Sequence, residues 1–338
     1  MNTTTIGVDL AKSVFQLSMA NQANKIVDRK RLTRSQFQKF LMLQPGCEIV
    51  MEACATSNYW AQFAKDHGHQ PKQLHALYVR PYVRRNKTDS ADADALVRAS
   101  CDPQLYPIPI KSHEQQALQA LHRIRQQFIQ TRTQRINIGR AIQAEFGLVL
   151  PRGSAGIANK LLAQLSEIPA SLHPQFDLIV DDIIEIKKKI NSLDKQLEAI
   201  AKEDPIAPLL LSIPGNGVIT ATVLVASVVD INVFKKGRQF SAFLGITPRE
   251  HSSGNTQRLG RISKQGNEYL RTMLIHGARS VMVQAKRQSN RSETLTDLHR
   301  WVLLMETRRP RNVVTVALAN KLARIVWAVW TTREPYSP

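Results

Sequence analysis

Apolar residues between positions 176 and 200 recur at alternating intervals of three and four, and this pattern constrains the fold more than any other in the chain. The set is Phe176, Ile179, Ile183, Ile186, Ile190, Leu193, Leu197 and Ile200. A heptad repeat with charged residues between its members predicts a helix with one apolar stripe, as in a coiled coil. We expect the stripe to pair with another subunit. The alternative is an antiparallel hairpin against residues 161–165 of the same chain.

The charge of the chain predicts a polyanionic partner. Its 46 Lys and Arg face 27 Asp and Glu, which gives a formal net charge of +19 and a pI near 10.2. Counted by segment, residues 1–110 carry +5, 111–152 carry +5, 153–204 carry −3 and 205–338 carry +12. Nucleic acid is the expected partner of such a protein. Residues 114–146, with several arginines, are the candidate RNA contact, and a solvated helix face is the alternative.

Other classes of protein fit the composition less well. Hydrophobic residues make up 43% of the chain, which argues against global disorder. The N-terminus does not read as a signal peptide, and the apolar run 218–229 is too short to span a bilayer. Three cysteines without metal-ligand spacing suggest a reducing compartment and no zinc site; they are Cys47, Cys54 and Cys101. We therefore expect a cytoplasmic protein of the prokaryotic cytosol or nucleoid, without a membrane partner.

The first hundred residues predict an α/β layer around a mixed sheet. Alternating or β-branched runs predict strands at 3–11, 14–21, 25–32, 46–54 and 73–79. Helical patterns predict helices at 35–43, with Ser35 near its N-cap, at 57–68, and from Thr88 or Asp89 onward. Three strands followed by alternating helices and strands are typical of an α/β domain.

The remainder of the chain predicts mostly helices. Residues 113–146 contain no Pro and only one Gly, which predicts one long helix or two. A Pro-Gly-x-Gly turn near residue 215 joins two apolar helical runs, and a Gly- and Ser-rich loop spans 251–266. We expect three parts: residues 1–150, an α/β domain with a basic helical extension; 151–204, a coiled-coil or helical linker; and 205–330, a mostly helical domain whose turn resembles a helix-hairpin-helix.

Four acids are candidates for a metal site. Asp9 and Glu52 lie in otherwise apolar strands, and Asp89 and Asp92 are three positions apart on a helix, which places them on one face. Asp94 lies round the helix and is expected to be a solvated charge. If the first and fourth strands are neighbours, the helix can close over Asp9 and Glu52.

Converging carboxylates are hard oxygen ligands suited to Mg²⁺, here two ions, for phosphoryl transfer on a nucleic acid. Each acid has an ordinary alternative: a strand-end acceptor for Asp9, an Arg partner for Glu52 and a helix cap for Asp89. The basic run Arg84, Arg85 and Lys87 precedes the helix and is expected to contact the nucleic acid.

These motifs resemble those of a known family. GVDLAK, then ME, then NKTDSAD is similar to the D-E-D-D pattern of a RuvC-like, ribonuclease H-fold domain. SIPGNGVITA, RQFSAFLGITPRE, SSGN and GRISKQGNEYLRTML extend the likeness through the C-terminal part. The chain therefore resembles the bridge-RNA-guided insertion-sequence transposases, relatives of the Piv-type DNA invertases. The resemblance implies catalytic and metal-binding roles for Asp9, Glu52, Asp89 and Asp92.

The resemblance also implies a serine nucleophile, which matches Ser253 before Gly254, with Ser252 beside it as the alternative. A serine–DNA phosphodiester would hold the broken strand while Mg²⁺ helps to activate the serine. Without the resemblance, SSGN would be read as an ordinary turn. Basic side chains surround it and are candidates for phosphate binding: Arg249, Arg258, Arg261, Lys264 and Arg271.

The family further implies that a guide (bridge) RNA selects donor and target DNA by base pairing. Arg125, Arg132 and Arg135 of the long helix are the candidate contacts of that RNA. A composite site is implied as well, in which the acids of one subunit act with the serine of another. This requires a homo-oligomer, a dimer or tetramer held by the coiled coil.

Two other functions remain open, and a third is set aside. A metal-dependent junction nuclease would use only the four acids and would leave free DNA ends. A non-catalytic nucleic-acid-binding protein would have a decayed site, which the presence of all four acids and the serine disfavours. A sugar-kinase or actin-like ATPase would need further Gly-rich phosphate loops, and the sequence has none.

Overall fold

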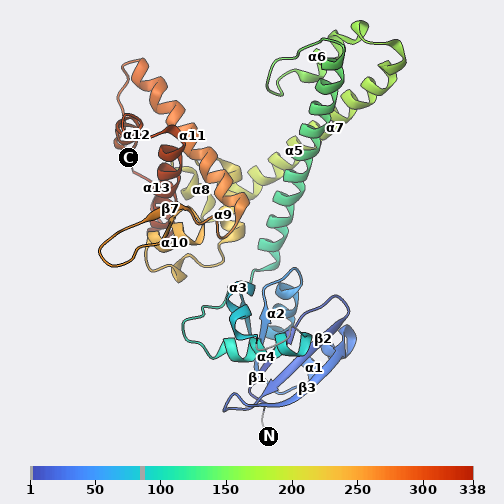
Figure 1. The fold of residues 1–338 in the computed structure, drawn as a ribbon, viewed down its shortest axis with the longest axis vertical. Helices are drawn as coiled ribbons and strands as arrows, with labels where there is room; N and C mark the ends of the chain where they lie inside the picture. The colour runs from blue at the N-terminus through green and yellow to red at the C-terminus, as the bar shows by residue number, and fades with distance from the viewer. Residues whose placement is uncertain (1–2, 84–87, 338) are drawn as a thin grey trace. The chain divides into compact units, whose positions relative to one another are not determined.

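The computed structural model describes residues 3–83 and 88–337, and the chain divides into two compact units, residues 1–112 and 113–338. The first unit is built on a five-stranded sheet, and the second is almost entirely helical (Figure 1). The three-part division expected from the sequence stays a prediction.

The sheet of the first unit is mixed. Its strands are β1 (Thr5–Asp9), β2 (Val14–Ala20), β3 (Ile26–Thr33), β4 (Glu48–Glu52) and β5 (Gln70–Leu74), in the spatial order β3-β2-β1-β4-β5. The β1–β2 and β2–β3 pairs are antiparallel, and the β1–β4 and β4–β5 pairs are parallel. The predicted mixed sheet is confirmed, and it is consistent with a RuvC-like fold.

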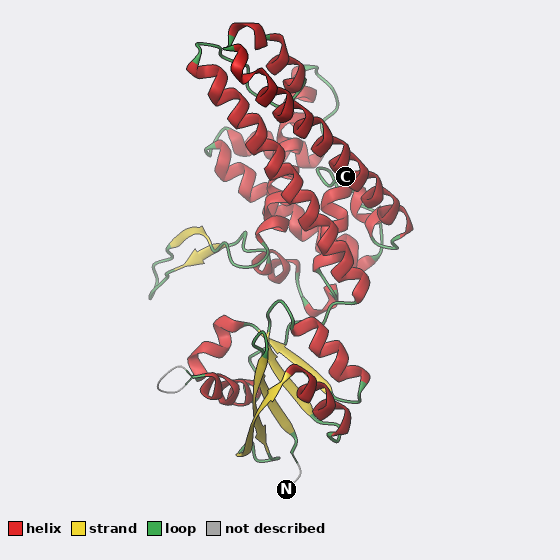
Figure 2. Cartoon of the chain, turned by 90° about the vertical axis from the view of Figure 1, so that its right-hand side faces the viewer, coloured by secondary structure: helices red, strands yellow, loops and turns green. Residues whose placement is uncertain are grey.

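Helices cover both faces of this sheet (Figure 2). The helices α1 (Arg34–Leu43) and α2 (Ser57–Asp66) pack on one face, where Phe15, Phe37 and Trp60 are fully buried. On the other face lies α4 (Asp89–Ser100), whose Leu96 packs with Val50. Because side chains alternate along a strand, β4 sends Ile49 and Met51 to the first face and Val50 to the second.

Ser35 lies near the N-cap of α1, as predicted, and the cap itself is Thr33, whose side chain forms a reciprocal capping box with Gln36. One local prediction for this unit was wrong. The strand expected at 73–79 ends at Leu74, and the chain turns into the short helix α3 (Ala76–Val79) and a 3₁₀ turn (Arg80–Tyr82). The His75 side chain accepts the Leu77 N–H and so begins this helix instead of prolonging the strand.

In the second unit, two long helices run side by side in opposite directions (Figure 1). They are α5 (His113–Glu145) and α7 (His173–Glu203), with α6 (Ile157–Ala163) and the 3₁₀ turns Leu165–Glu167 and Ala170–Leu172 between them. The heptad residues Phe176, Ile183, Ile186, Ile190 and Leu197 are buried within the chain, while Ile179, Leu193 and Ile200 are half-buried. Packing of α7 on α5, α6 and α9 thus accounts for most of the apolar stripe.

The rest of the unit is a helical bundle with one hairpin. Its elements are α8 (Ala207–Leu211), α9 (Val218–Ser227), a 3₁₀ turn (Ile231–Val233), α10 (Gly237–Phe243), β6 (Pro248–Glu250), β7 (Leu259–Ile262), α11 (Glu268–Asn290), α12 (Asp297–Glu306) and α13 (Arg311–Thr332). The predicted turn between α8 and α9 is present. Its Gly215, at φ +83°, packs directly on Gly277 of α11, so neither position has room for a Cβ.

Helix α13 lies in the core of this bundle, where Leu318, Leu322 and Val326 are fully buried. By length and composition alone it is the one helix in the described part of the chain that could cross a membrane, and half of its most apolar window is buried inside the chain.

Candidate active site

The first pair of acids lies at one edge of the sheet. Asp9 is the last residue of β1 and Glu52 the last of β4, and these strands run parallel with Val8 opposite Met51. Asp9 shares a strand face with Gly7, and Glu52 shares one with Val50, which is the face that α4 covers. The prediction that the first and fourth strands are neighbours is therefore confirmed. Both carboxylates lie on the face of the sheet that α4 covers.

Helix α4 approaches β1 closely at Gly7. A Cβ at this position would collide with the Ala93 carbonyl oxygen and would lie 3.0 Å from Val97 Cγ2 and 3.2 Å from Leu96 Cβ. Only glycine leaves room for the helix backbone. A glycine inside a strand, two positions before an acid, was the sequence signal for this approach, and the sequence reasoning missed it. Asp92 directly precedes Ala93 on α4. The close packing of α4 on β1 therefore brings Asp92 to the sheet edge where Asp9 and Glu52 lie.

Three of the four predicted acids line one cavity of about 640 Å³. Its lining residues are Asp9, Leu10, Glu52, Cys54, Ala76, Val79, Arg80, Val83 and Asp92. Asp89 does not line it: this residue is exposed in the first turn of α4, which Thr88 caps by accepting the Ala91 N–H. Arg80 places a cation among the acids and was not predicted.

The carboxylate set fits a divalent cation by its chemistry, because hard oxygen donors at the end of a sheet are the ligands that Mg²⁺ prefers. In residues 3–83 and 88–337, however, no three His, Cys, Asp or Glu side chains lie close enough together to hold an ion. Asp9, Glu52 and Asp92 thus line one cavity, but their carboxylates are too far apart to bind one ion together.

Asp94 corrects one prediction, since it is buried rather than solvated. Its Oδ1 accepts Ser18 Oγ at 2.6 Å and Arg29 Nε at 3.1 Å, and its Oδ2 lies 2.9 Å from Arg29 and 3.5 Å from Arg98. Burial opposes ionisation, but the hydrogen bonds from Arg29 and Ser18 and the charges of Arg29 and Arg98 outweigh it and lower the pKa of Asp94. Asp94 therefore fastens α4 to β2 and β3, two residues from Asp92.

The predicted serines lie in the loop of the β6–β7 hairpin. Ser252 Oγ donates to Glu250 Oε1 at 2.6 Å and accepts the Arg258 N–H at 3.2 Å, so it holds the hairpin together. Ser253 exchanges backbone hydrogen bonds with Thr256 across a tight turn, in which Gly254 has φ +54°. The Ser253 side chain is exposed, and its hydroxyl has no hydrogen bond within the described residues.

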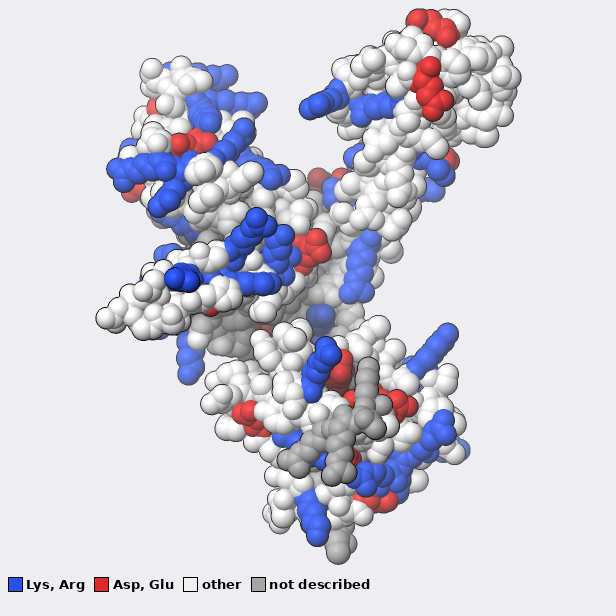
Figure 3. Space-filling model, viewed as in Figure 1, with Lys and Arg blue, Asp and Glu red and all other residues white. Residues whose placement is uncertain are grey.

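Four of the predicted basic side chains of this loop are exposed, namely Arg249, Arg258, Arg261 and Lys264. Figure 3 shows Lys and Arg side chains along the hairpin and the neighbouring helices of the same unit. Arg271 differs from the prediction. It is buried on α11 and donates to the carbonyl oxygens of Leu244 and Gln265, so it supports the loop from inside instead of facing a ligand.

The arginines predicted for RNA on α5 are partly used within the unit. Arg125 pairs with Asp194 and Arg135 with Asp182 at 2.8 Å, both of α7, while Arg132 is half-buried and its Nε is buried without a hydrogen-bond partner. The acidic segment of the sequence thus neutralises part of the basic helix. Arg84, Arg85 and Lys87 lie outside the described residues.

Replacing Gly7 by alanine should loosen α4 from β1. We expect Gly7→Ala to lower the free energy of unfolding of the first unit by about 1–3 kcal/mol, the usual cost of overpacking a core. Hydrogen exchange at the amides of β1 and α4 measures this locally. Gly260→Ala is the matched control, because its Cβ would meet nothing closer than 3.6 Å. Unchanged exchange in Gly7→Ala would contradict the close approach.

The Asp94 network predicts a dependence on pH. Because the pKa of Asp94 is lowered in the folded state, its contribution is present above the ordinary Asp value of 3.8 and is lost as the pH falls through the lower folded value. Asp94→Asn should cost about 1–3 kcal/mol at neutral pH, since hydrogen bonds to a buried charge are lost. The same exchange measurement should show the variant and the wild type converging below pH 3.8, with exposed Asp66→Asn as control. A difference that does not change with pH would show that Asp94 is not ionised in the fold.

Comparison with known proteins identifies both halves of the chain. Residues 6–143 match a DEDD transposase domain family, and residues 207–293 match the family described as Transposase IS116/IS110/IS902 family. A probable family 20 transposase of Pseudomonas aeruginosa is 38% identical over 100% of both chains. The transposase for insertion sequence element IS1111A of Coxiella burnetii is 36% identical, over 98% of this chain and 90% of its own.

A more distant relative is the pilin gene-inverting protein of Moraxella bovis, which is 25% identical over 99% of this chain and 98% of its own. The resemblance drawn from the sequence motifs is therefore confirmed, and the DEDD domain suggests the use of a divalent metal. With full-length relatives above 30% identity and both domains matched in order, the chain belongs to the IS116/IS110/IS902 family of insertion-sequence transposases, enzymes that cleave and rejoin DNA.

Proposed function

We propose that this transposase cuts and rejoins DNA through a covalent bond between Ser253 and a DNA phosphate, assisted by Mg²⁺ at Asp9, Glu52 and Asp92. The observation that carries the proposal is the convergence of these three acids, from β1, β4 and α4, on one cavity of a domain that matches the DEDD type. Bound Mg²⁺ would supply charge stabilisation to a phosphate in transfer.

The serine step is a phosphoryl exchange that balances without another reactant. The Ser253 Oγ–P bond forms while one P–O bond to a deoxyribose breaks, and the serine proton passes to the leaving oxygen. The reverse attack by a DNA hydroxyl rejoins a strand and restores the serine. Two features support Ser253 over Ser252: its hydroxyl is exposed and makes no hydrogen bond in the described chain, whereas Ser252 Oγ bridges Glu250 and the Arg258 backbone.

The exposed cations of the hairpin would bind the phosphate under attack. Arg249, Arg258 and Arg261 are exposed, lie in the hairpin that presents Ser253 and carry charge that no described acid pairs with. The Arg249 guanidinium also donates to the Ser263 carbonyl oxygen at 3.1 Å. Positive groups around a phosphate favour a transition state that gathers negative charge. Arg271 has no direct part in this proposal, because its guanidinium is buried.

A guide RNA and a homo-oligomer belong to the same proposal. The strongly basic composition supports an RNA partner in addition to donor and target DNA. Exposed apolar side chains on α5 and α7 support a further subunit at this helix pair; they are Ile124, Ile138, Leu178 and Ile184.

The acids should differ in their effects on recombination. We expect Asp9→Asn and Asp92→Asn to lower recombination of DNA carrying the element's ends by at least about 100-fold, the upper end of the loss for a residue that only supports a metal ligand. Asp89→Asn should cost less, because Asp89 lies outside the cavity. Exposed Asp66→Asn is the control for the lost charge. Full recombination by Asp92→Asn in Mg²⁺ would refute the metal site.

The nucleophile can be trapped directly. The protein with its co-purified RNA is incubated with labelled DNA and Mg²⁺, then denatured, and protein-linked DNA is measured. We expect the adduct in the wild type and Ser252→Ala, none in Ser253→Ala, and none after ribonuclease treatment of the complex. An adduct lost only in Ser252→Ala would move the nucleophile by one residue. Nicked DNA without any adduct would instead indicate a metal-dependent nuclease.

A further inference from the structure

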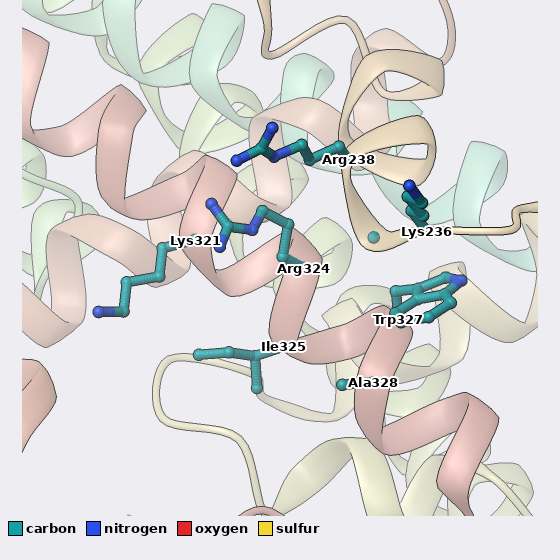
Figure 4. Close-up of a pocket in the computed structure, with 8 residues that line it drawn as sticks. Lys236, Arg238, Lys321, Arg324, Ile325, Trp327 and Ala328 are labelled. Carbon is teal, nitrogen blue, oxygen red and sulfur yellow. The ribbon is translucent and has the colours of Figure 1, made fainter.

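A second cavity, of about 500 Å³, lies in the C-terminal unit between the start of α10 and helix α13 (Figure 4). Its lining residues are Lys236, Gly237, Arg238, Lys321, Arg324, Ile325, Trp327 and Ala328. Neither the serine loop nor any predicted site residue contributes to it. The residues of this pocket are therefore distinct from those proposed for cleavage.

The charges of this pocket are all positive. Four of its eight lining residues are Lys or Arg and none is acidic. No described carboxylate lies within ion-pair distance of these four cations, in contrast to Arg125 and Arg135 of the same unit. Figure 4 shows the guanidinium groups of Arg238 and Arg324 extending toward the same side. Cations gathered without a counter-charge favour an anionic ligand.

The fold brings the two halves of the pocket together at Gly237. A Cβ there would lie 3.3 Å from the Cα, the Cβ and the carbonyl oxygen of Arg324, so the loop rests almost on the α13 backbone. On α13, the positions 321, 324, 325 and 328 form one stripe at helical spacing, while Leu322 and Val326 face the core. The stripe is thus held in place by a buried helix.

The floor of the pocket is apolar. Trp327 is half-buried, and its Nε1 donates to the Phe234 carbonyl oxygen at 2.9 Å, which fixes the indole. Ile325 and Ala328 line the same cavity. A fixed aromatic surface beside several cations suits a ligand with a flat ring and a phosphate, since bases stack on aromatic side chains while Lys and Arg hold the backbone.

We propose that this pocket binds an unpaired nucleotide of a nucleic-acid strand, with its phosphates against Arg238, Arg324 and Lys236 and its base on the floor at Trp327. The pocket fits a single strand, because a paired and stacked base has no free face for the indole. RNA and single-stranded DNA share this chemistry. The inference rests on the proposed function only in taking nucleic acid as the partner.

The test is a binding measurement on the full chain without divalent metal, so that cleavage plays no part. Fluorescein-labelled oligonucleotides of uridine, of thymidine and of abasic deoxyribose, equal in length, are titrated and followed by anisotropy over a range of salt. The pocket variant is Arg238→Gln with Arg324→Gln. The matched control is Arg308→Gln with Arg309→Gln, which removes two exposed arginines of the same unit outside the pocket.

We expect the pocket variant to bind the base-carrying strands about tenfold more weakly and to lower the salt slope by about 1.4, at 0.7 for each lost phosphate contact with a single strand. The control should change affinity about twofold at most. The wild type should bind the abasic strand more weakly than either normal strand. Tighter binding of the uridine strand would identify RNA as the source of the nucleotide, and tighter binding of the thymidine strand would identify DNA.

Three results would overturn the proposal: equal losses in the pocket and control variants, equal binding of abasic and normal strands, or displacement of the oligonucleotide by polyglutamate as readily as by an unlabelled strand. The last result would identify a site for acidic polymers in general. This measurement contains no divalent metal and reads binding alone, so a failure of the pocket and a failure of the cleavage proposal can be told apart.

Discussion

The parallel pairing of β1 with β4 is the interaction on which the candidate active site depends. Each of these strands ends in an acid, and the register that sets Val8 opposite Met51 brings both acids to one edge of the sheet. The close packing of α4 on Gly7 then adds Asp92 from a third element. Three carboxylates from three elements can converge only because backbone hydrogen bonds and a missing side chain fix the distances between those elements.

In the same helix, the buried charge of Asp94 holds α4 in place on the sheet. Asp94 is neutralised by Arg29 and Arg98 and accepts the Ser18 hydroxyl, so the ion network is satisfied and costs less than an isolated buried charge would. Asp92, two residues earlier, has no ion pair with a described residue. The acid-rich stretch therefore combines one carboxylate that holds the helix and one that faces the cavity, and charge alone does not distinguish them.

In the second unit, the distribution of charge follows the packing. The acidic segment lies on α7, where Asp182 and Asp194 pair with arginines of α5, and the apolar stripe of α7 is buried against the same neighbour. Much of the excess positive charge is left to the C-terminal bundle and its hairpin. The exposed cations around Ser253 and those of the α10–α13 pocket differ from Arg125 and Arg135 of α5 in having no acidic partner in the described chain.

The sequence by itself determined the mixed sheet and the long helices, because strand and helix periods are local properties. The short helix α3 and the β6–β7 hairpin were not predicted. The sequence motifs also identified the family and predicted a site at Asp9, Glu52, Asp89 and Asp92, of which all but Asp89 line one cavity. Only the tertiary structure decided that Asp94 is buried, that Asp89 lies outside the cavity and that Arg271 supports a loop from within. These outcomes depend on residues distant in the chain, such as Ser18 and Arg29 for Asp94. The pocket at Trp327 likewise joins two segments more than eighty residues apart, whose meeting no local pattern encodes.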